Sequence, residues 1–97
     1  MVVGTLEVRL LVREARSLKD KRQVVRGILD RIRSQFLVAA TETDAQEDHR
    51  RVVLGIAAVG HEVAAVRQHL QSIQEALRVH PIAEYLSGDL TVGREVV

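Results

Sequence analysis

Cysteine, tryptophan and asparagine are absent from this chain of 97 residues, and proline occurs once. Without cysteine the chain can form no disulfide, no thiolate nucleophile and no cysteine-bound zinc site, and nothing in it favours an oxidising compartment. Twelve of the 14 basic residues are arginine. Few thermolabile residues and an arginine bias suit a heat-adapted source, although a GC-rich genome produces the same bias.

Long hydrophobic runs are also missing. The longest uncharged apolar stretch, residues 52–60, is nine residues long, far short of the roughly 20 that span a bilayer. Glu7 and Arg9 lie where the apolar segment of a signal peptide would have to run. We therefore expect a cytoplasmic protein with no membrane contact, folded as a single domain over residues 1–97.

Apolar residues recur at the periods of strands and helices. The hydroxyl of Ser17 is predicted to cap the first helix by accepting from the backbone N–H of Asp20. The order β-α-β-β-α-β predicts an α+β, ferredoxin-like fold, with a four-stranded antiparallel sheet and both helices on one face. The predicted helices cover residues 18–35 and 62–79, and the strands cover 2–12, 37–43, 52–59 and a last segment from Leu90, after a turn at 87–89.

The sheet face opposite the helices has no cover within such a domain. On the third strand neither alternating set of residues is polar, whether it is read from Val52 or from Val53. An uncovered apolar face or a bare edge strand usually acquires a partner. We therefore predict a homo-oligomer, most simply a dimer, that forms through the open sheet face or an edge strand.

Side chains for catalysis or metal binding form no recognisable motif. The serines lie outside a Gly-x-Ser-x-Gly elbow, and the loop at residues 13–17 has no glycine to cradle a phosphate. The acidic residues of 42–48 are typical of a solvated connection. The four histidines lack the spacing of a zinc pair. We expect no catalytic residue, no metal and no cofactor, and hence no enzyme; an anionic substrate near Arg13 and Arg16 is the least favoured alternative.

Positive charge is concentrated in one segment. Between Arg9 and Arg33 nine basic residues face three acidic ones, a net charge of +6, whereas the rest of the chain has five basic and ten acidic residues, a net charge of −5. At 100° per residue the helix brings much of this charge into one stripe, opposite its apolar residues. The candidate nucleic-acid-binding residues are Lys19, Arg22, Arg26 and Arg33 in the stripe, with Arg16 and Lys21 near its start.

Such a stripe can neutralise phosphates and release their counterions. The simpler interpretation, which the sequence alone favours, is a solvated helix face that is partly self-paired through Arg26 and Asp30 at i, i+4. The third strand has no aromatic residue on which bases could stack. An RNA contact would therefore be made by the first helix, to the backbone or to the shape of a duplex.

The hexapeptide Ser-Leu-Lys-Asp-Lys-Arg at residues 17–22 resembles the YlxP-like family of short bacterial proteins of unknown function. Residues 1–6, 24–26, 42–44 and 54–57 agree with it, while His49 stands where the family commonly has a tryptophan. The resemblance implies a ferredoxin-like fold, a bacterial cytoplasmic protein and no established activity. Members are often encoded beside translation-initiation and ribosome-maturation genes.

Two hypotheses of different kinds follow. The leading one is a non-enzymatic accessory protein that contacts RNA or the ribosome through the basic first helix. The alternative is a homo-oligomeric module that binds a small ligand at a subunit interface.

Overall fold

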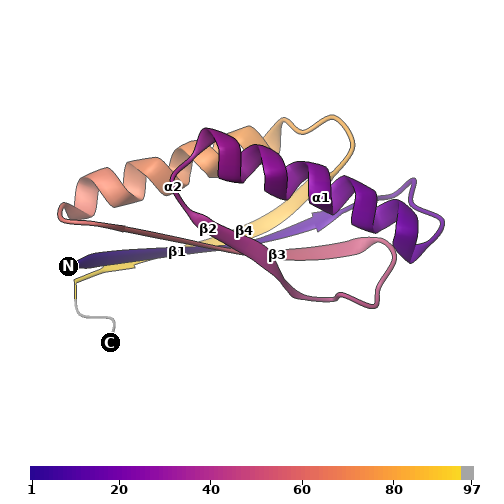
Figure 1. Ribbon diagram of the computed structural model, residues 1–97, viewed down its shortest axis with the longest axis horizontal. Helices are drawn as coiled ribbons and strands as arrows, with labels where there is room; N and C mark the ends of the chain where they lie inside the picture. The colour runs from indigo at the N-terminus through magenta and orange to yellow at the C-terminus, as the bar shows by residue number, and fades with distance from the viewer. Residues whose placement is uncertain (95–97) are drawn as a thin grey trace.

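One antiparallel sheet carries two helices on the same face (Figure 1). The computed structural model describes residues 1–94. Neighbouring strands pair in the order β2-β3-β1-β4, and each pair is antiparallel. The predicted ferredoxin-like fold is therefore confirmed. The elements are β1 (Val2–Leu11), α1 (Leu18–Gln35), β2 (Ala39–Asp44), β3 (Arg51–Gly60), α2 (Val63–Arg78) and β4 (Glu84–Gly93).

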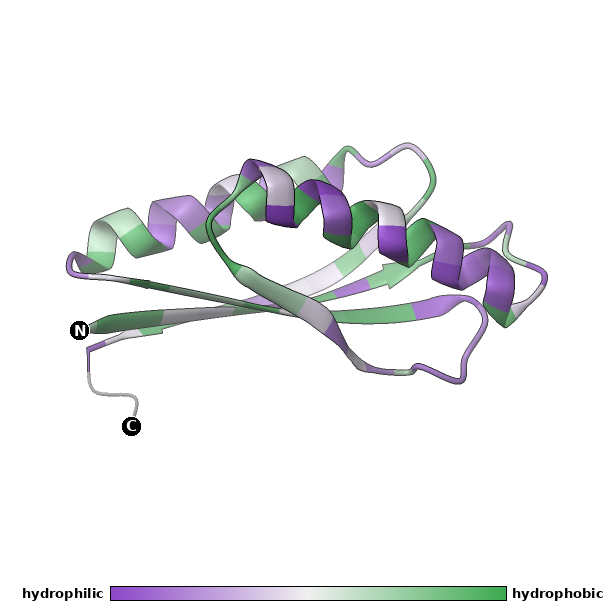
Figure 2. Cartoon of the chain, viewed as in Figure 1, coloured by the Kyte–Doolittle hydropathy of each residue, from purple (hydrophilic) through white to green (hydrophobic). Residues whose placement is uncertain are grey.

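The core lies between the sheet and the two helices. Leu6 of β1 pairs in register with Ile56 of β3, and alternate residues on both strands point toward the helices. Leu70 and Ile73 of α2 are fully buried against them. Figure 2 shows apolar residues along the central strands, and hydrophilic residues in the first turns of α1 and in the β2–β3 hairpin. Within residues 1–94, neither helix combines the length and the apolar character needed to cross a membrane.

Helix α1 begins as predicted. Ser17 is extended, and its hydroxyl accepts from the Asp20 N–H at 3.1 Å. The Asp20 carboxylate accepts from the backbone N–H of Arg16 at 3.0 Å, one residue further back than in a standard capping box. These two bonds position the first turns of α1, which carry Lys19 and Arg22.

The last strand begins at Glu84, so the prediction of a turn at residues 87–89 is wrong. Ser87 and Asp89 pair with Arg9 and Glu7 of β1, because the ladder to β1 outweighs the turn preference of the local sequence. Gly88 lies under the Tyr85 hydroxyl, which accepts from Gln74 Nε2 at 2.7 Å. A glycine is needed at this position because a Cβ would clash with the Tyr85 hydroxyl, and not because the chain turns there.

Candidate nucleic-acid interface

One row on α1 carries three cations that are free of ion pairs within residues 1–94. Lys19, Arg22 and Arg26 are exposed, and they follow one another at i, i+3 and i+7, about 4.5 and 6 Å apart along the helix axis. Within residues 1–94 none of them forms an ion pair, and the predicted Arg26–Asp30 pair is not made. Their charges are therefore available to an external anion. Val25, Ile28 and Ile32 are buried on a different side of the helix, which leaves the row exposed.

The two ends of the stripe differ from its centre. Arg33 is exposed but tethered, because its Nε donates to the Ala40 carbonyl oxygen at 3.1 Å and its Nη2 donates to the same oxygen. Arg16 is exposed in the β1–α1 loop, with its backbone held by Asp20. Arg16 thus extends the row of cations beyond the helix, while Arg33 is partly committed to the edge of β2.

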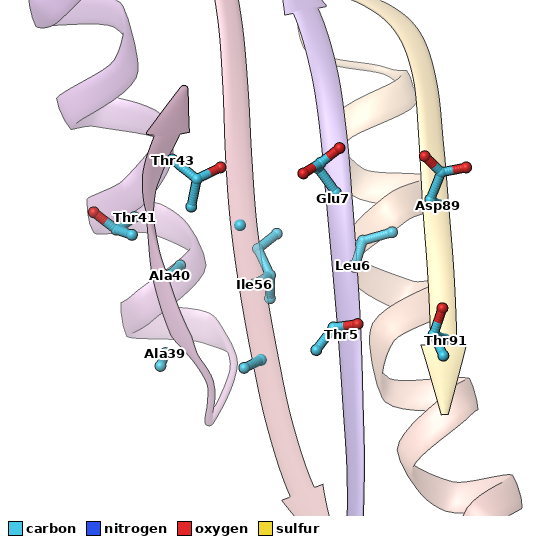
Figure 3. A pocket seen from close by; sticks show the side chains of 12 residues that line it. Thr5, Leu6, Glu7, Ala39, Ala40, Thr41, Thr43, Ile56, Asp89 and Thr91 are labelled. Atoms are coloured by element: carbon cyan, nitrogen blue, oxygen red, sulfur yellow. The ribbon is translucent and has the colours of Figure 1, made fainter. Parts of the chain in front are cut away.

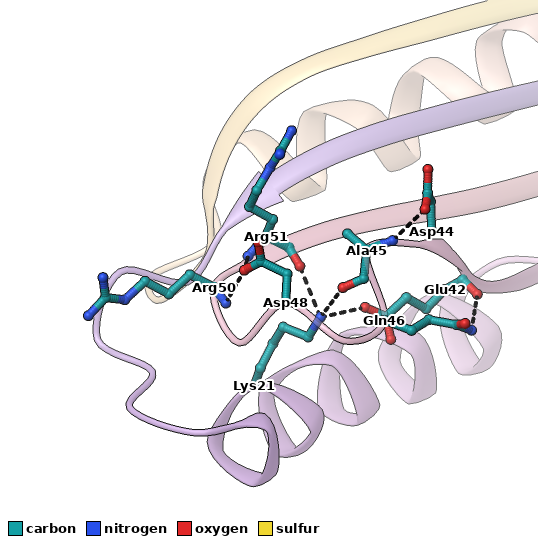
Figure 4. A network of polar contacts seen from close by, with 8 residues as sticks. All are labelled: Lys21, Glu42, Asp44, Ala45, Gln46, Asp48, Arg50 and Arg51. Carbon is teal, nitrogen blue, oxygen red and sulfur yellow. Dashed lines mark hydrogen bonds and ion pairs between the residues drawn. The ribbon is translucent and has the colours of Figure 1, made fainter.

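Lys21 is not a surface residue, and its prediction as a nucleic-acid-binding residue is wrong. Its side chain is fully buried. The ammonium donates to the carbonyl oxygens of Ala45 at 2.7 Å and Arg51 at 3.0 Å, and lies 3.0 Å from Glu42 Oε2 (Figure 4). The Glu42 contact is an ion pair, since that oxygen has no hydrogen-bond donor of good geometry. A helix has more than one face, and position 21 lies on the face that looks at the sheet.

The β2–β3 hairpin is held together by the groups around Lys21. Asp48 Oδ1 accepts from the backbone N–H groups of Arg50 at 2.8 Å and Arg51 at 2.9 Å. These two bonds lower the pKa of Asp48 below its ordinary value, because they favour the carboxylate. Ala45 adopts a left-handed conformation with φ of 57°, which is costly for alanine. Its carbonyl is one of the two that Lys21 holds.

Arg50 joins the basic region from this hairpin. It is exposed, and its Nε donates to the carbonyl oxygen of Ala15 at 3.4 Å, so its guanidinium lies beside the loop that begins α1. Figure 4 shows the side chain extending away from the hairpin toward that loop. Sequence reasoning missed Arg50, because its segment carries net negative charge. The predicted pairing of strands was the one available signal, because an antiparallel pair puts the start of β3, and with it Arg50, beside the end of β1.

The open face of the sheet is mixed rather than apolar. A shallow hollow of about 520 Å³ lies at its centre. Its floor is Gly55 and Ala57, and a Cβ at Gly55 would lie 2.5 Å from Thr43 Cγ2. Polar residues of the other strands line it (Figure 3): Thr5, Glu7, Thr41, Thr43, Asp89 and Thr91. The expectation of an apolar face came from β3 and holds only for that strand, where Val59 is 70% exposed.

Arg9 holds the acidic groups of this face. Its guanidinium donates to Asp89 Oδ2 at 3.0 Å and also to Glu7 Oε1. The hydrogen bond to Asp89 raises the pKa of Arg9 above its ordinary value. Both carboxylates form an ion pair with the Arg9 guanidinium. Within residues 1–94 no group of three histidine, aspartate or glutamate side chains could hold a metal ion. The open face therefore presents hydroxyls and already paired charges.

Comparison with known proteins agrees with the hexapeptide resemblance. A family model described as "Protein of unknown function (DUF503)" matches residues 3–89. The chain is 33% identical over 72 residues to "Uncharacterized protein YlxP" of Bacillus subtilis (strain 168), an alignment that covers 74% of this chain and 78% of that protein. Half of the hexapeptide has a structural role here, as Ser17, Asp20 and Lys21 cap the helix and hold the hairpin.

Proposed function

The chain belongs to the DUF503 family of proteins of unknown function, and we propose that it is a non-enzymatic cytoplasmic accessory protein that contacts RNA or the ribosome through the outer face of α1. The observation that carries the proposal is the row of Lys19, Arg22 and Arg26, exposed on α1 and free of ion pairs within residues 1–94. A row of cations without acidic partners can neutralise the charges of a phosphate backbone and release its counterions.

The strength of such a contact can be stated through its salt dependence. Three phosphates neutralised on a duplex give a slope of log affinity against log salt of about −2.7, and an affinity that falls about 40-fold between 50 and 200 mM salt. A solvated helix face that binds nothing would give no such slope. Salt dependence therefore separates the proposal from the simpler interpretation.

The test is a charge reversal with a matched control. The triple variant Lys19→Glu, Arg22→Glu, Arg26→Glu is compared with Arg67→Glu, Arg78→Glu, Arg94→Glu, which changes the net charge equally on other surfaces. Binding to structured ribosomal RNA and to ribosomal subunits is measured across a salt series. We expect the α1 variant to lose both affinity and slope, and the control to lose much less. If the two variants lose affinity and salt slope equally, binding depends only on the net charge of the protein, and the α1 site is refuted.

The hollow on the open sheet face favours a second candidate, a homo-oligomeric module that encloses a small ligand. Its volume of about 520 Å³ lies within the roughly 300–1,000 Å³ of ordinary ligand sites, and Gly55 and Ala57 let another surface approach closely. We propose that a second copy would close the hollow. Light scattering at micromolar concentration tests this, with Ala57→Arg expected to give a monomer. A wild-type protein that is strictly monomeric would eliminate the candidate.

A further inference from the structure

The fold brings one more cation, Arg50, to the start of α1. Arg50 is 28 residues beyond Arg22 in the sequence, yet its Nε bonds to Ala15 O, in the loop that ends at the Ser17 cap. The Val12 N–H donates to the Arg50 carbonyl oxygen at 2.8 Å, which fixes the backbone of the hairpin against the end of β1. Arg50 is therefore attached to the β1–α1 connection twice, by its backbone carbonyl oxygen to Val12 and by its side-chain Nε to Ala15.

Lys21 of α1 holds the same hairpin through its carbonyl groups. Its ammonium binds the carbonyl oxygens of Ala45 and Arg51, which stand on either side of the hairpin loop. Because Lys21 is part of α1, this bond network ties the hairpin directly to the helix that carries the free cations. These bonds and the Lys21–Glu42 ion pair attach the hairpin that carries Arg50 to the start of α1.

We propose that Arg50 and the first turns of α1 form one composite surface, and that this surface binds the phosphate backbone of double-stranded RNA. The inference rests on the proposed function and deepens it. Its cations are Arg16, Lys19, Arg22 and Arg50, all exposed, and within residues 1–94 none of their charged side-chain groups forms an ion pair. The carboxylates of Asp20 and Asp48 bond to the backbone N–H groups of Arg16 and Arg50, and not to their guanidinium groups. Arg13 is excluded, because it is neutralised by Glu84 at 2.8 Å.

The side chains around this surface favour a duplex over a single strand. Proteins that bind single strands without sequence preference stack the bases on aromatic side chains. The two aromatic residues of the phenylalanine, tyrosine and tryptophan class are both half-buried and engaged, Phe36 edge-on to His69 and Tyr85 beneath the Arg78 guanidinium. The surface therefore offers charge without stacking, and a duplex carries about twice the charge per unit length of a single strand.

Arg50→Gln is the variant that tests the composite surface. Its affinity is measured by fluorescence anisotropy for a labelled RNA duplex of about 20 base pairs, longer than the roughly 16 that a double-stranded RNA-binding domain spans, and for one strand of the same sequence. Loss of one phosphate contact should lower duplex affinity five- to tenfold near 0.1 M salt and reduce the salt slope by about 0.9. Arg67→Gln, on α2 beyond the far end of β3, changes the net charge equally and should leave affinity nearly unchanged.

Arg50→Lys separates charge from the bond to Ala15. It keeps the cation but lacks the Nε donor, so we expect it to retain most of the duplex affinity. Circular dichroism confirms that each variant is folded. If Arg50→Gln binds like the wild type while the α1 triple variant does not, the composite surface is refuted and the proposed function stands. Equal affinity for duplex and single strand would overturn the duplex preference, and no binding of either RNA would overturn the proposed function as well.

Discussion

Replacing Lys21 by methionine should destabilise the protein severely, although the sequence analysis puts this residue among the basic residues near the start of the stripe. Methionine keeps the length of the side chain but removes the ammonium. Glu42, whose side chain is 15% exposed, would then be left as a nearly buried carboxylate with no counter-charge. The carbonyl groups of Ala45 and Arg51 would lose their donor as well.

The magnitude follows from these three losses. Removing one partner of a buried ion pair costs about 3–5 kcal/mol, because the remaining charge stays desolvated. A domain of this size has a free energy of unfolding of about 5–15 kcal/mol, so the variant would lose a large fraction of it. At about 4–8 °C per kcal/mol, the melting temperature should fall by roughly 12–40 °C.

Urea denaturation followed by far-ultraviolet circular dichroism measures the effect, because the chain has no tryptophan to report by fluorescence. Lys19→Met is the matched control, since it is the same change two residues away on the exposed face, and its stability should stay within about 0.5 kcal/mol of the wild type. Lys21→Met combined with Glu42→Leu should recover part of the loss by removing the stranded charge. A loss below about 1 kcal/mol for Lys21→Met would refute the buried network.

Three further predictions concern other contacts. An amine-acylating reagent should modify Lys19 and leave Lys21 unmodified in the folded protein, as mass spectrometry would show; equal labelling would place Lys21 at the surface. Ser17→Ala should cost about 1 kcal/mol of stability, while Ser17→Asp keeps an acceptor and should cost less; urea titrations compare them, and equal losses would deny the cap. His80 Nδ1 accepts from the N–H groups of Ile82 and Ala83, and burial, with the charge of Arg31, lowers the pKa of His80 below its ordinary value. Because the unfolded chain then binds the proton more readily, stability should fall as pH drops below the unfolded-state pKa of about 6.5. His80→Asn keeps an acceptor but does not titrate. In thermal unfolding at a series of pH values, this variant should therefore lack the loss of stability that is due to His80.

Helix α1 shows how much of the site the sequence determines. The spacing of Val25, Ile28 and Ile32 and the Ser17 cap set the limits and the buried face of this helix, and both agree with the structure. These features depend on local periodicity and on hydrogen bonds between near neighbours, so they can be read from the chain itself. The outward position of Lys19, Arg22 and Arg26 follows from the same periodicity.

The limits of sequence reasoning are clearest at Lys21 and Ser87. Lys21 lies four residues before Val25 and seven before Ile28, so helical spacing places it on the buried face, but its acceptors at residues 42, 45 and 51 become its neighbours only in the folded protein. Residues 87–89 have the composition of a turn, yet pairing with β1 makes them part of a strand. In both cases a long-range partner outweighs a local preference.

The sequence by itself therefore determined the order of the elements, the ferredoxin-like fold and the basic face of α1. Only the tertiary structure decided which cations are free. It gave Lys21 its buried partners, tied Arg33 to Ala40, paired Arg13 with Glu84, and brought Arg50 to the start of the helix. The physical reason is that a side chain's charge follows from its residue type, whereas its partners and its contact with water depend on chain segments far away in the sequence.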